Sequence, residues 1–405
     1  MFMNSAERES LSATARAAEA RSPFARLNDL LTPVKPGKPP INMAVGEPQH
    51  AVPEFVGPVL AKHIAEFGRY PANKGTEDFR KAVSQWLSRR YALPRALDPE
   101  TEVIVLNGTR EGLFLAAIAA ARYVGPRQLK PAILIPNPFY AAYAAGADAA
   151  GCEAVYMPAI ARSGFLSDLS ALPNALLART AAFYLASPSN PQGAVADAAY
   201  LARLVSLARK HGFLVFAGEC YSEIYSTQKP AGTLEQAAPD FANVVVFHSL
   251  SKRSNLPGLR VGFAAGDAGF LARYIELRNV AAPQVPVPAQ EVAIAAYADE
   301  THVEENRRLY VQKFDLADQI IGDRYGYKRP AGGFFLWLDV SAYGGSEKAA
   351  LALWREAGLR VLPGGYAARS AADGSNPGAD YIRIAMVHGN ATTAEALHRL
   401  VAVLG

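Results

Sequence analysis

Short apolar runs alternate with longer helical patterns between about residues 100 and 270. The runs predict strands at 102–106, 132–135, 153–157, 181–186, 213–217, 244–248 and 261–265. Most are apolar throughout, which is typical of strands covered on both faces. One helical segment spans 198–212 and ends on Gly212, a residue suited to a helix C-cap. This alternation predicts an α/β fold with a mostly parallel sheet and helices on both faces.

The pattern changes near residue 290. Prolines become dense at 283–288, and a long helical stretch follows them. Strand-like segments then occur at 326–340, 359–366 and 380–387, which predicts a smaller α+β unit. We therefore expect a large domain at 46–290 and a small domain at 291–405, with an N-terminal segment, 1–45, that packs with the small domain.

Composition and charge are those of an ordinary globular protein. Hydrophobic residues make up 50% of the chain. The net charge is +4, and the charged residues are spread along the sequence without a run of like charges, so we expect no nucleic-acid surface. Cys152 and Cys220 lie too far apart for a metal-knuckle spacing or a disulfide framework, so we expect no metal and a reducing compartment. The N-terminus lacks a signal-peptide pattern, and the apolar run at 113–121 is shorter than the ~20 residues that span a bilayer. We expect a cytoplasmic protein without a membrane segment.

Polar and aromatic residues follow several predicted strands, where ligands bind in an open parallel sheet. Gly108 and Thr109 follow the first strand and begin a helix, whose free N–H groups favour an anion. Tyr140, Asn190 and Tyr221 follow three others. Taken singly, each has a plain alternative: a tight turn for Gly108, packing for Tyr140 and an Asx-type turn for Asn190.

The segment HSLSKRSNLPGLRVGF, 248–263, contains Lys252 between Ser249 and Ser251, with Arg260 further on. A lone loop lysine is usually only a solvated charge. An amine among cationic and hydroxyl groups, however, can have a lowered pKa and attack a carbonyl. Phosphate donors, aromatic rings and one amine at one edge of a sheet indicate pyridoxal 5'-phosphate (PLP), whose aldehyde is held by a lysine.

The chain resembles the class I/II aminotransferases, which are fold-type I PLP transferases, from about residue 40 to its C-terminus. The motifs that carry the resemblance are AVGEP (44–48), RYPANKGTEDFR (69–80), NGTREG, PNPFY, SPSNPQG, ECYSEIY, SLSKRSNLPGLRVGF, AGGFFLW and YIRIA. SLSKRSNLPGLR, with ECYSEIY and PNPFY, is further similar to N-succinyldiaminopimelate aminotransferases of lysine biosynthesis. Relatives that act on alanine, aspartate or aromatic acids share most of these motifs.

The resemblance implies a role for each matching residue around PLP. Lys252 would be the Schiff-base lysine and proton shuttle, and Tyr140 would stack on the pyridine ring. Asn190 and Tyr221 would bond the phenolic oxygen of the ring. The phosphate would be held by Arg260, Ser249, Ser251 and the amides of Gly108 and Thr109.

The resemblance also implies how substrate and a second subunit are bound. Arg383 would clamp the substrate α-carboxylate in a two-pronged fork, and Gly46 would approach the same carboxylate. Tyr70 would reach the phosphate of the partner subunit, so a homodimer with shared sites is expected. Arg253 and Asn255 are candidates for a distal substrate carboxylate, with surface placement as the favoured alternative.

One position departs from the family pattern. An aspartate normally stands where this chain has Gly218, and it keeps the pyridine nitrogen protonated. Glu219 is a poor substitute, because adjacent strand residues point to opposite faces. Two interpretations remain: a natural relative with weakened chemistry, or one changed residue in an otherwise ordinary enzyme. The retained site residues favour the second. We expect PLP to bind and turnover to fall by on the order of 10²-fold or more.

The leading hypothesis is an aminotransferase with glutamate as donor and N-succinyl-2-amino-6-oxopimelate as acceptor. The alternatives are an aminotransferase of other specificity, a PLP-dependent C–S lyase on the same fold, or a catalytically weak PLP-binding protein. Release of ammonia and pyruvate from cystathionine would distinguish the lyase. A protein that binds PLP but converts no amino donor would support the last alternative.

Overall fold

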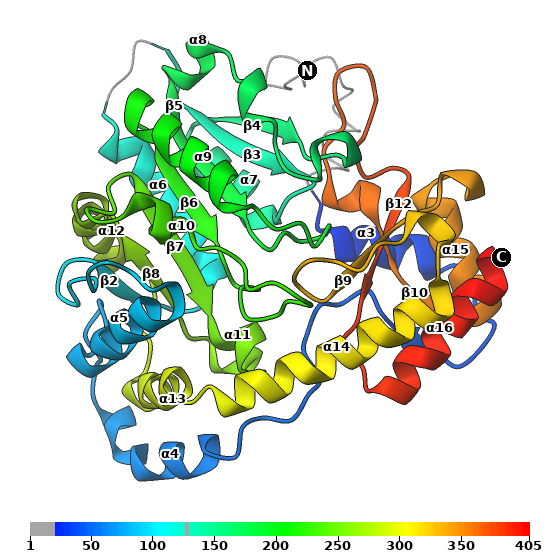
Figure 1. Ribbon diagram of the computed structural model, residues 1–405, viewed down its shortest axis with the longest axis horizontal. Coiled ribbons are helices and arrows are strands. Elements are labelled where there is room, and N and C mark those ends of the chain that lie inside the picture. The colour runs from blue at the N-terminus through cyan, green and yellow to red at the C-terminus, as the bar shows by residue number, and fades with distance from the viewer. Residues whose placement is uncertain (1–20, 126–128) are drawn as a thin grey trace.

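The main sheet lies among helices in the left half of the view in Figure 1. The computed structural model describes residues 21–125 and 129–405, and within these ranges seven strands pair in the order β2-β8-β7-β6-β5-β3-β4. Their bounds are β2 (Val103–Leu106), β3 (Ala132–Asn137), β4 (Glu153–Pro158), β5 (Thr180–Ala186), β6 (Leu214–Gly218), β7 (Val244–Ser249) and β8 (Gly262–Gly266). Strand β8 is antiparallel to both neighbours, and the other pairings are parallel. The predicted strands and the mostly parallel sheet are confirmed.

Helices cover both faces of this sheet, as predicted. One face packs against α6 (Thr109–Tyr123), α7 (Ala141–Ala149) and α12 (Ala268–Ala281). The other packs against α5 (Glu77–Tyr91), α9 (Ala198–His211), α10 (Thr233–Ala237) and α13 (Val287–Ala298). Neighbouring strand residues alternate between the two cores, so Phe183 belongs to one and Tyr184 to the other. Helix α9 ends at Gly212, whose φ of 68° confirms the predicted C-cap.

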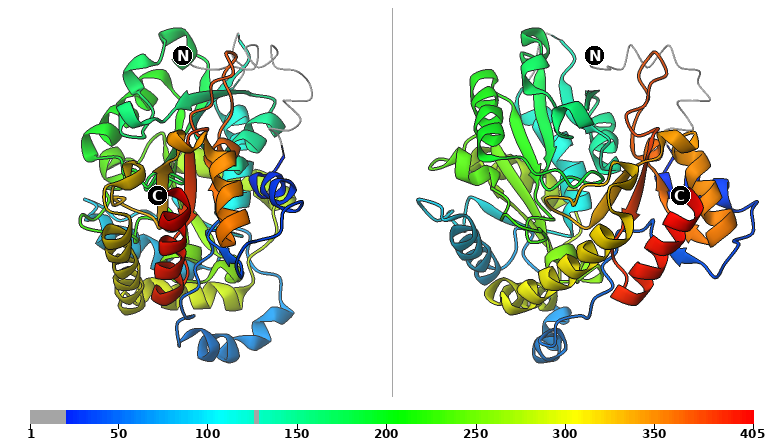
Figure 2. Two further views of the ribbon diagram at one scale, coloured as in Figure 1. Left: turned by 90° about the vertical axis from the view of Figure 1, so that its right-hand side faces the viewer. Right: turned by 45° about the vertical axis from the view of Figure 1, so that its right-hand side comes forward.

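A second, smaller unit lies to one side (Figures 1 and 2). Its antiparallel sheet has the order β11 (Leu362–Pro363), β12 (Tyr381–Ala385), β9 (Phe335–Asp339). Helices α14 (Thr301–Ile321), α15 (Ser346–Ala357) and α16 (Asn390–Leu404) pack with it, and β1 (Ile41–Asn42) pairs with β10 (Leu359–Arg360). Figure 1 also labels the short α4 (Val56–Lys62), α8 (Asn174–Leu177) and α11 (Leu250–Arg253). The predicted α+β unit is confirmed.

The polypeptide passes from the first apolar core to the second between α13 and α14. Side chains of α13 as far as Tyr297 pack in the core of the main sheet, whereas α14 joins the second core from Tyr310 onward. Near the N-terminus, α3 (Pro23–Leu31) packs Leu27 and Leu31 against Leu362 and Tyr366. The division at residue 290 stays a prediction. Residues 1–20 of the predicted N-terminal segment lie outside the described residues.

Among the helices that the structure describes, none is long and apolar enough to cross a membrane.

Candidate active site

The loop after β2 and the turn after β7 lie side by side at one edge of the main sheet. Gly262, the first residue of β8, pairs with Leu106 at the end of β2 and with Ser249 at the end of β7. Gly108 caps α6 with a φ of 79°, and a Cβ added there would lie 2.2 Å from Nη2 of Arg260. Glycine at this position therefore lets the Arg260 guanidinium pack directly against the backbone at the start of α6, whose free N–H groups favour an anion.

Hydroxyl groups line the same corner. The Ser249 hydroxyl accepts a hydrogen bond from the Ser251 amide at 3.1 Å and donates to the Ser251 hydroxyl at 2.8 Å. Oγ1 of Thr109 lies 3.4 Å from Sγ of Cys220. The guanidinium of Arg260 is exposed and donates to a backbone carbonyl at 2.9 Å. The structure thus brings together the residues predicted to hold a phosphate, namely Gly108, Thr109, Ser249, Ser251 and Arg260.

Lys252 points toward the segment that carries Gly46. Its Nζ donates a 2.5 Å hydrogen bond to the Gly46 carbonyl oxygen and lies 5.3 Å from the centroid of the Phe334 ring. Burial lowers the pKa of Lys252 to about 8, and the cations of Arg383 and Arg260 act in the same direction. The expected lowering is therefore present, although burial contributes more to it than the neighbouring cations do.

Arg383 joins three distant segments. Its guanidinium donates to the Asn190 side-chain oxygen at 2.9 Å and to the Ala44 carbonyl at 2.6 Å, and it lies 4.5 Å from the Phe335 ring centroid. Burial lowers its pKa to about 10, and its Nε is buried without a partner within the described chain. A Cβ at Gly46 would lie 2.7 Å from the Phe335 ring, so only glycine allows this close approach of the backbone.

The three predicted tyrosines are placed differently. Tyr140 accepts a 2.8 Å hydrogen bond from Nε of Arg110 and lines a cavity together with Asn190. The Tyr221 ring packs edge-on against two phenylalanines, and burial raises the pKa of its hydroxyl. Tyr70 is 97% exposed, so almost nothing in the described part of the chain covers it.

Glu219 points away from the site, as expected. Its carboxylate accepts hydrogen bonds of 2.8 Å from the Tyr91 hydroxyl and from the Thr233 amide, and it lies 3.2 Å from Nε2 of His248. Burial alone would raise the pKa of Glu219, but His248 and Thr233 outweigh it and the net direction is downward. This carboxylate is therefore committed to the opposite face of the sheet.

Tyr143 is a site residue that the sequence reasoning missed. A Cβ added to Gly218 would lie 3.1 Å from the Tyr143 hydroxyl, so this hydroxyl faces the position where the family has an aspartate. The Tyr143 ring stacks on Tyr184 with centroids 4.2 Å apart. The available signal was its spacing of three residues from Tyr140, which places both residues on one side of α7.

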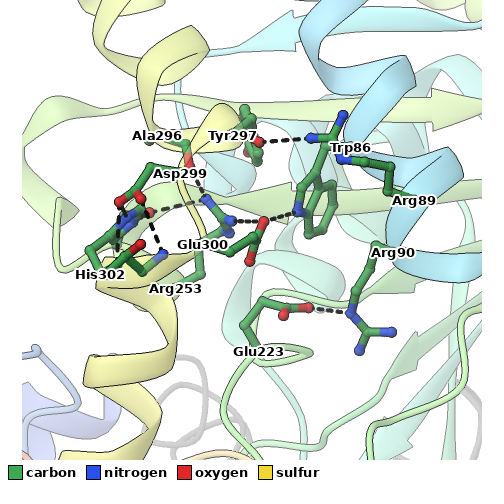
Figure 3. Close-up of polar contacts among 12 residues, drawn as sticks. Trp86, Arg89, Arg90, Glu223, Arg253, Ala296, Tyr297, Asp299, Glu300 and His302 are labelled. Carbon is green, nitrogen blue, oxygen red and sulfur yellow. Dashed lines mark hydrogen bonds and ion pairs between the residues drawn. The ribbon is translucent and has the colours of Figure 1, made fainter.

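Arg253 was expected at the surface but is only 3% exposed. Figure 3 shows its polar contacts. It donates to the Ala296 carbonyl at 2.7 Å and to Glu300 at 2.8 Å. Nε1 of Trp86 donates to the same carboxylate at 3.0 Å. Asn255 is also buried, so the favoured surface placement of both residues is wrong. Nη1 and Nη2 of Arg253 are thus both bonded, and they anchor the turn that carries Lys252 to the end of α13.

A buried amine between two arginines, at the carboxyl edge of a mostly parallel sheet, defines an α/β enzyme for anionic substrates. Residues 38–400 match the family described as aminotransferase class I and II, and the chain belongs to that family. An LL-diaminopimelate aminotransferase of Desulforudis audaxviator (strain MP104C) is 32% identical over 390 residues, which cover 94% of this chain and 95% of the relative.

Solved structures agree with this assignment. An aminotransferase from Neisseria meningitidis Z2491 matches with a TM-score of 0.89 and 36% identity, covering 95% of this chain and 98% of the other. A probable N-succinyldiaminopimelate aminotransferase from Thermus thermophilus matches with a TM-score of 0.82 and 25% identity, covering 95% and 100%. The predicted family, fold class and enzyme class are confirmed.

Proposed function

We propose that this enzyme is a PLP-dependent aminotransferase that moves an amino group between an amino acid, with glutamate as the favoured donor, and a 2-oxo acid. The observation that carries the proposal is the Lys252 amine. It is held at 2.5 Å from the Gly46 carbonyl, and its pKa is lowered to about 8. At that pKa about one tenth of the amine is neutral at pH 7 and can react with an aldehyde, far more than for an ordinary lysine.

The residues present fit PLP. A Cβ at Gly108 would collide with the Arg260 guanidinium, so glycine lets this cation approach the backbone at the start of α6, where free N–H groups favour a phosphate. Hydroxyls at Ser249 and Ser251 and the guanidinium of Arg260 are suitable donors to its oxygens. Tyr140 would cover the ring, while Asn190 and Tyr221 would bond its phenolic oxygen.

When bound, PLP supplies an electron sink for the carbon that loses its proton. Lys252 would hold the aldehyde end before substrate binds, and its Nζ would move that proton once the substrate amine has displaced it. Arg383 binds the substrate α-carboxylate, and its buried Nε offers a donor that has no partner within the described residues. Arg383 already donates to Asn190 and to the Ala44 carbonyl, so its fork is oriented before substrate arrives.

The favoured acceptor is N-succinyl-2-amino-6-oxopimelate, a substrate of lysine biosynthesis. The activity named for the Thermus thermophilus neighbour supports it. The Desulforudis relative is described as acting on LL-diaminopimelate, so we carry that compound as a second candidate. A C–S lyase and a weak PLP-binding protein remain the alternatives from other reaction classes.

Visible absorbance of the purified protein with PLP, before and after excess glutamate, tests this function. We expect a lysine-bound cofactor band that is lost in Lys252→Ala and that shifts when glutamate is added. No band would contradict the PLP assignment. A band that the amino donors glutamate and LL-diaminopimelate both leave unchanged would favour the weak-binding alternative, with Gly218→Asp as the next variant to measure.

A further inference from the structure

A second buried lysine lies on α14, outside the site described so far. Lys313 is 1% exposed, and burial lowers its pKa to about 7. Its nearest polar partner among the described residues is not a carboxylate but His50, whose Nε2 lies 2.5 Å from Nζ. A buried lysine without a carboxylate partner is destabilising, so its presence points to a role beyond packing.

Lys313 begins a chain of hydrogen bonds that ends at the peptide of Lys252. Nδ1 of His50 lies 2.6 Å from Oδ1 of Asn306. The Asn306 amide nitrogen donates to the Lys252 carbonyl at 3.1 Å and to the Arg253 carbonyl at 3.3 Å. Because the Asn306 oxygen can only accept, His50 carries its proton on Nδ1 and accepts from Lys313 at Nε2. The donor and the acceptor of each of these hydrogen bonds are therefore assigned.

These hydrogen bonds hold one end of a short segment, residues 44–50, whose middle contacts the Lys252 amine. Residues 44–50 carry Gly46, whose carbonyl accepts from the Lys252 amine at 2.5 Å, and end at His50. The same segment is thus tied to the Lys252 amine at Gly46 and, through His50 and Asn306, to the Lys252 main chain. Packed rings support this arrangement, since the Tyr310 ring centroid lies 4.6 Å from that of His50 and 5.3 Å from that of Phe334.

We propose that His50, Asn306 and Lys313 are positioning residues that hold the segment 44–50 in register with the Lys252 turn and thereby set the place of the amine. This inference rests on the proposed function, in which Lys252 is the reactive group. The hydrogen bonds among Lys313, His50 and Asn306 do not include the phosphate donors. The segment that they hold reaches the Lys252 amine at Gly46 and Arg383 at Ala44, so we expect them to influence both groups.

The hydrogen bond between Lys313 and His50 requires that only one of these two side chains carries a positive charge. If His50 and Lys313 were both cationic, two N–H donors would face each other without an acceptor. Burial lowers the pKa of His50, and the Lys313 charge lowers it further, whereas Asn306 and Glu305 raise it. Tyr310, which faces both groups, stays neutral because burial raises its pKa. A depressed pKa means that the contribution of His50 is present above its usual value of 6.5 and is lost on acidification.

Hydrogen exchange of the cofactor-free full chain tests the inference without PLP. Lys313→Met keeps a long unbranched side chain and removes the buried charge, so we expect the fold to be retained, with thermal melting as the check. Exchange at 44–50 should become about 3- to 10-fold faster, the change expected for one lost hydrogen bond. Asn306→Ala should have the same effect. Lys348→Met, at an exposed lysine of α15, is the matched control.

A spectroscopic titration of the PLP-loaded protein gives the second readout. In Lys313→Met the pH midpoint of the cofactor band should move relative to wild type, and in Lys348→Met it should not, because only the first variant frees the segment that contacts the amine. Unchanged exchange at 44–50 or an unmoved midpoint would overturn the inference. A wild-type protein without any cofactor band would overturn the proposed function, while the exchange experiment would still decide whether the chain positions the segment.

Discussion

At the scale of single residues, the chemistry of this protein depends on what surrounds the Lys252 amine. Its pKa is lowered first by burial, and the cations of Arg383 and Arg260 add to the effect. Nearby groups also hold the amine in place, since it donates to the Gly46 carbonyl. Position and protonation are therefore set by different neighbours, and substitutions can separate them.

The first prediction concerns the pH dependence of PLP capture by the cofactor-free protein. Only the neutral amine attacks an aldehyde, and the amine becomes neutral as the pH rises through its pKa. Stopped-flow absorbance should show a rate that rises with pH and levels off, with a midpoint near the pKa of about 8 rather than the usual 10.5. Lys252→Ala is the control and should show no capture. A rate that is still rising steeply above pH 10 would contradict the lowered pKa.

A second prediction concerns Gly218. An aspartate there would place its Cβ 3.1 Å from the Tyr143 hydroxyl, which must shift slightly and can then donate to the new carboxylate. Restoring this charge should raise turnover by on the order of 10²-fold. Steady-state kinetics with glutamate and a 2-oxo acid measure it. Gly57→Asp makes the same change where nothing lies within 4 Å of the added Cβ, and it should leave turnover unchanged. Equal rates for Gly218→Asp and wild type would refute this account.

At the scale of elements, helix ends and strand ends determine which groups meet. The start of α6 and the turn after β7 are held together because Gly262 pairs with both neighbouring strands. Arg253 connects that turn to α13 through the Ala296 carbonyl and Glu300. Since α13 packs in the main core as far as Tyr297 and α14 joins the second core only from Tyr310 onward, we propose that the domain boundary falls in the first half of α14.

Comparing Gly108→Ala with Gly212→Ala should separate the effect of backbone strain on stability from the effect of an added methyl group on PLP binding. Gly108 and Gly212 both have positive φ, 79° and 68°, so alanine at either position should cost about 1–3 kcal/mol of stability. Only at Gly108 would the new methyl group meet the Arg260 guanidinium, whereas nothing lies within 4 Å at Gly212. Thermal melting should therefore report a loss for both variants. Fluorescence titration should report weaker PLP binding, by at least about tenfold, for Gly108→Ala alone. Equal PLP affinity in the two variants would exclude the proposed phosphate site.

At the scale of the whole molecule, the exposure of Tyr70 indicates a surface for a partner. Its side chain is 97% exposed, and Ile64 and Phe67 nearby are more than half exposed. Clustered apolar exposure of this kind marks an interaction surface. We propose that a second copy of the chain covers it and that Tyr70 reaches the phosphate of the partner.

Mixed dimers test this sharing directly. Tyr70→Ala and Lys252→Ala should each be inactive or weak as homodimers. After the two variants are mixed and allowed to exchange subunits, one site per dimer would contain an intact Lys252 and an intact Tyr70, so activity should return. Sedimentation should give twice the mass of the chain. Mixtures that are no more active than the variants alone would argue that each site is complete within one chain.

The sequence alone determined the strands, the helices and the edge of the sheet where the chemistry lies. Apolar runs report local burial, and the carboxyl ends of parallel strands meet at one edge whatever the details of packing. Lys252 and the groups predicted to hold a phosphate could therefore be assigned from their order along the chain. The family motifs supplied the roles that spacing alone left open.

Only the tertiary structure decided which distant groups meet. Arg383 and Asn190 are 193 residues apart, and His50 and Asn306 are 256 apart, so no local period links them. Arg253 was expected at the surface because charged residues are mostly exposed, yet the end of α13 buries it. The sequence likewise did not predict the approach of Tyr143 to Gly218 or the hydrogen bonds that link Lys313 to Lys252. Periodicity reports whether a side chain is buried, whereas its partner depends on how separate elements pack.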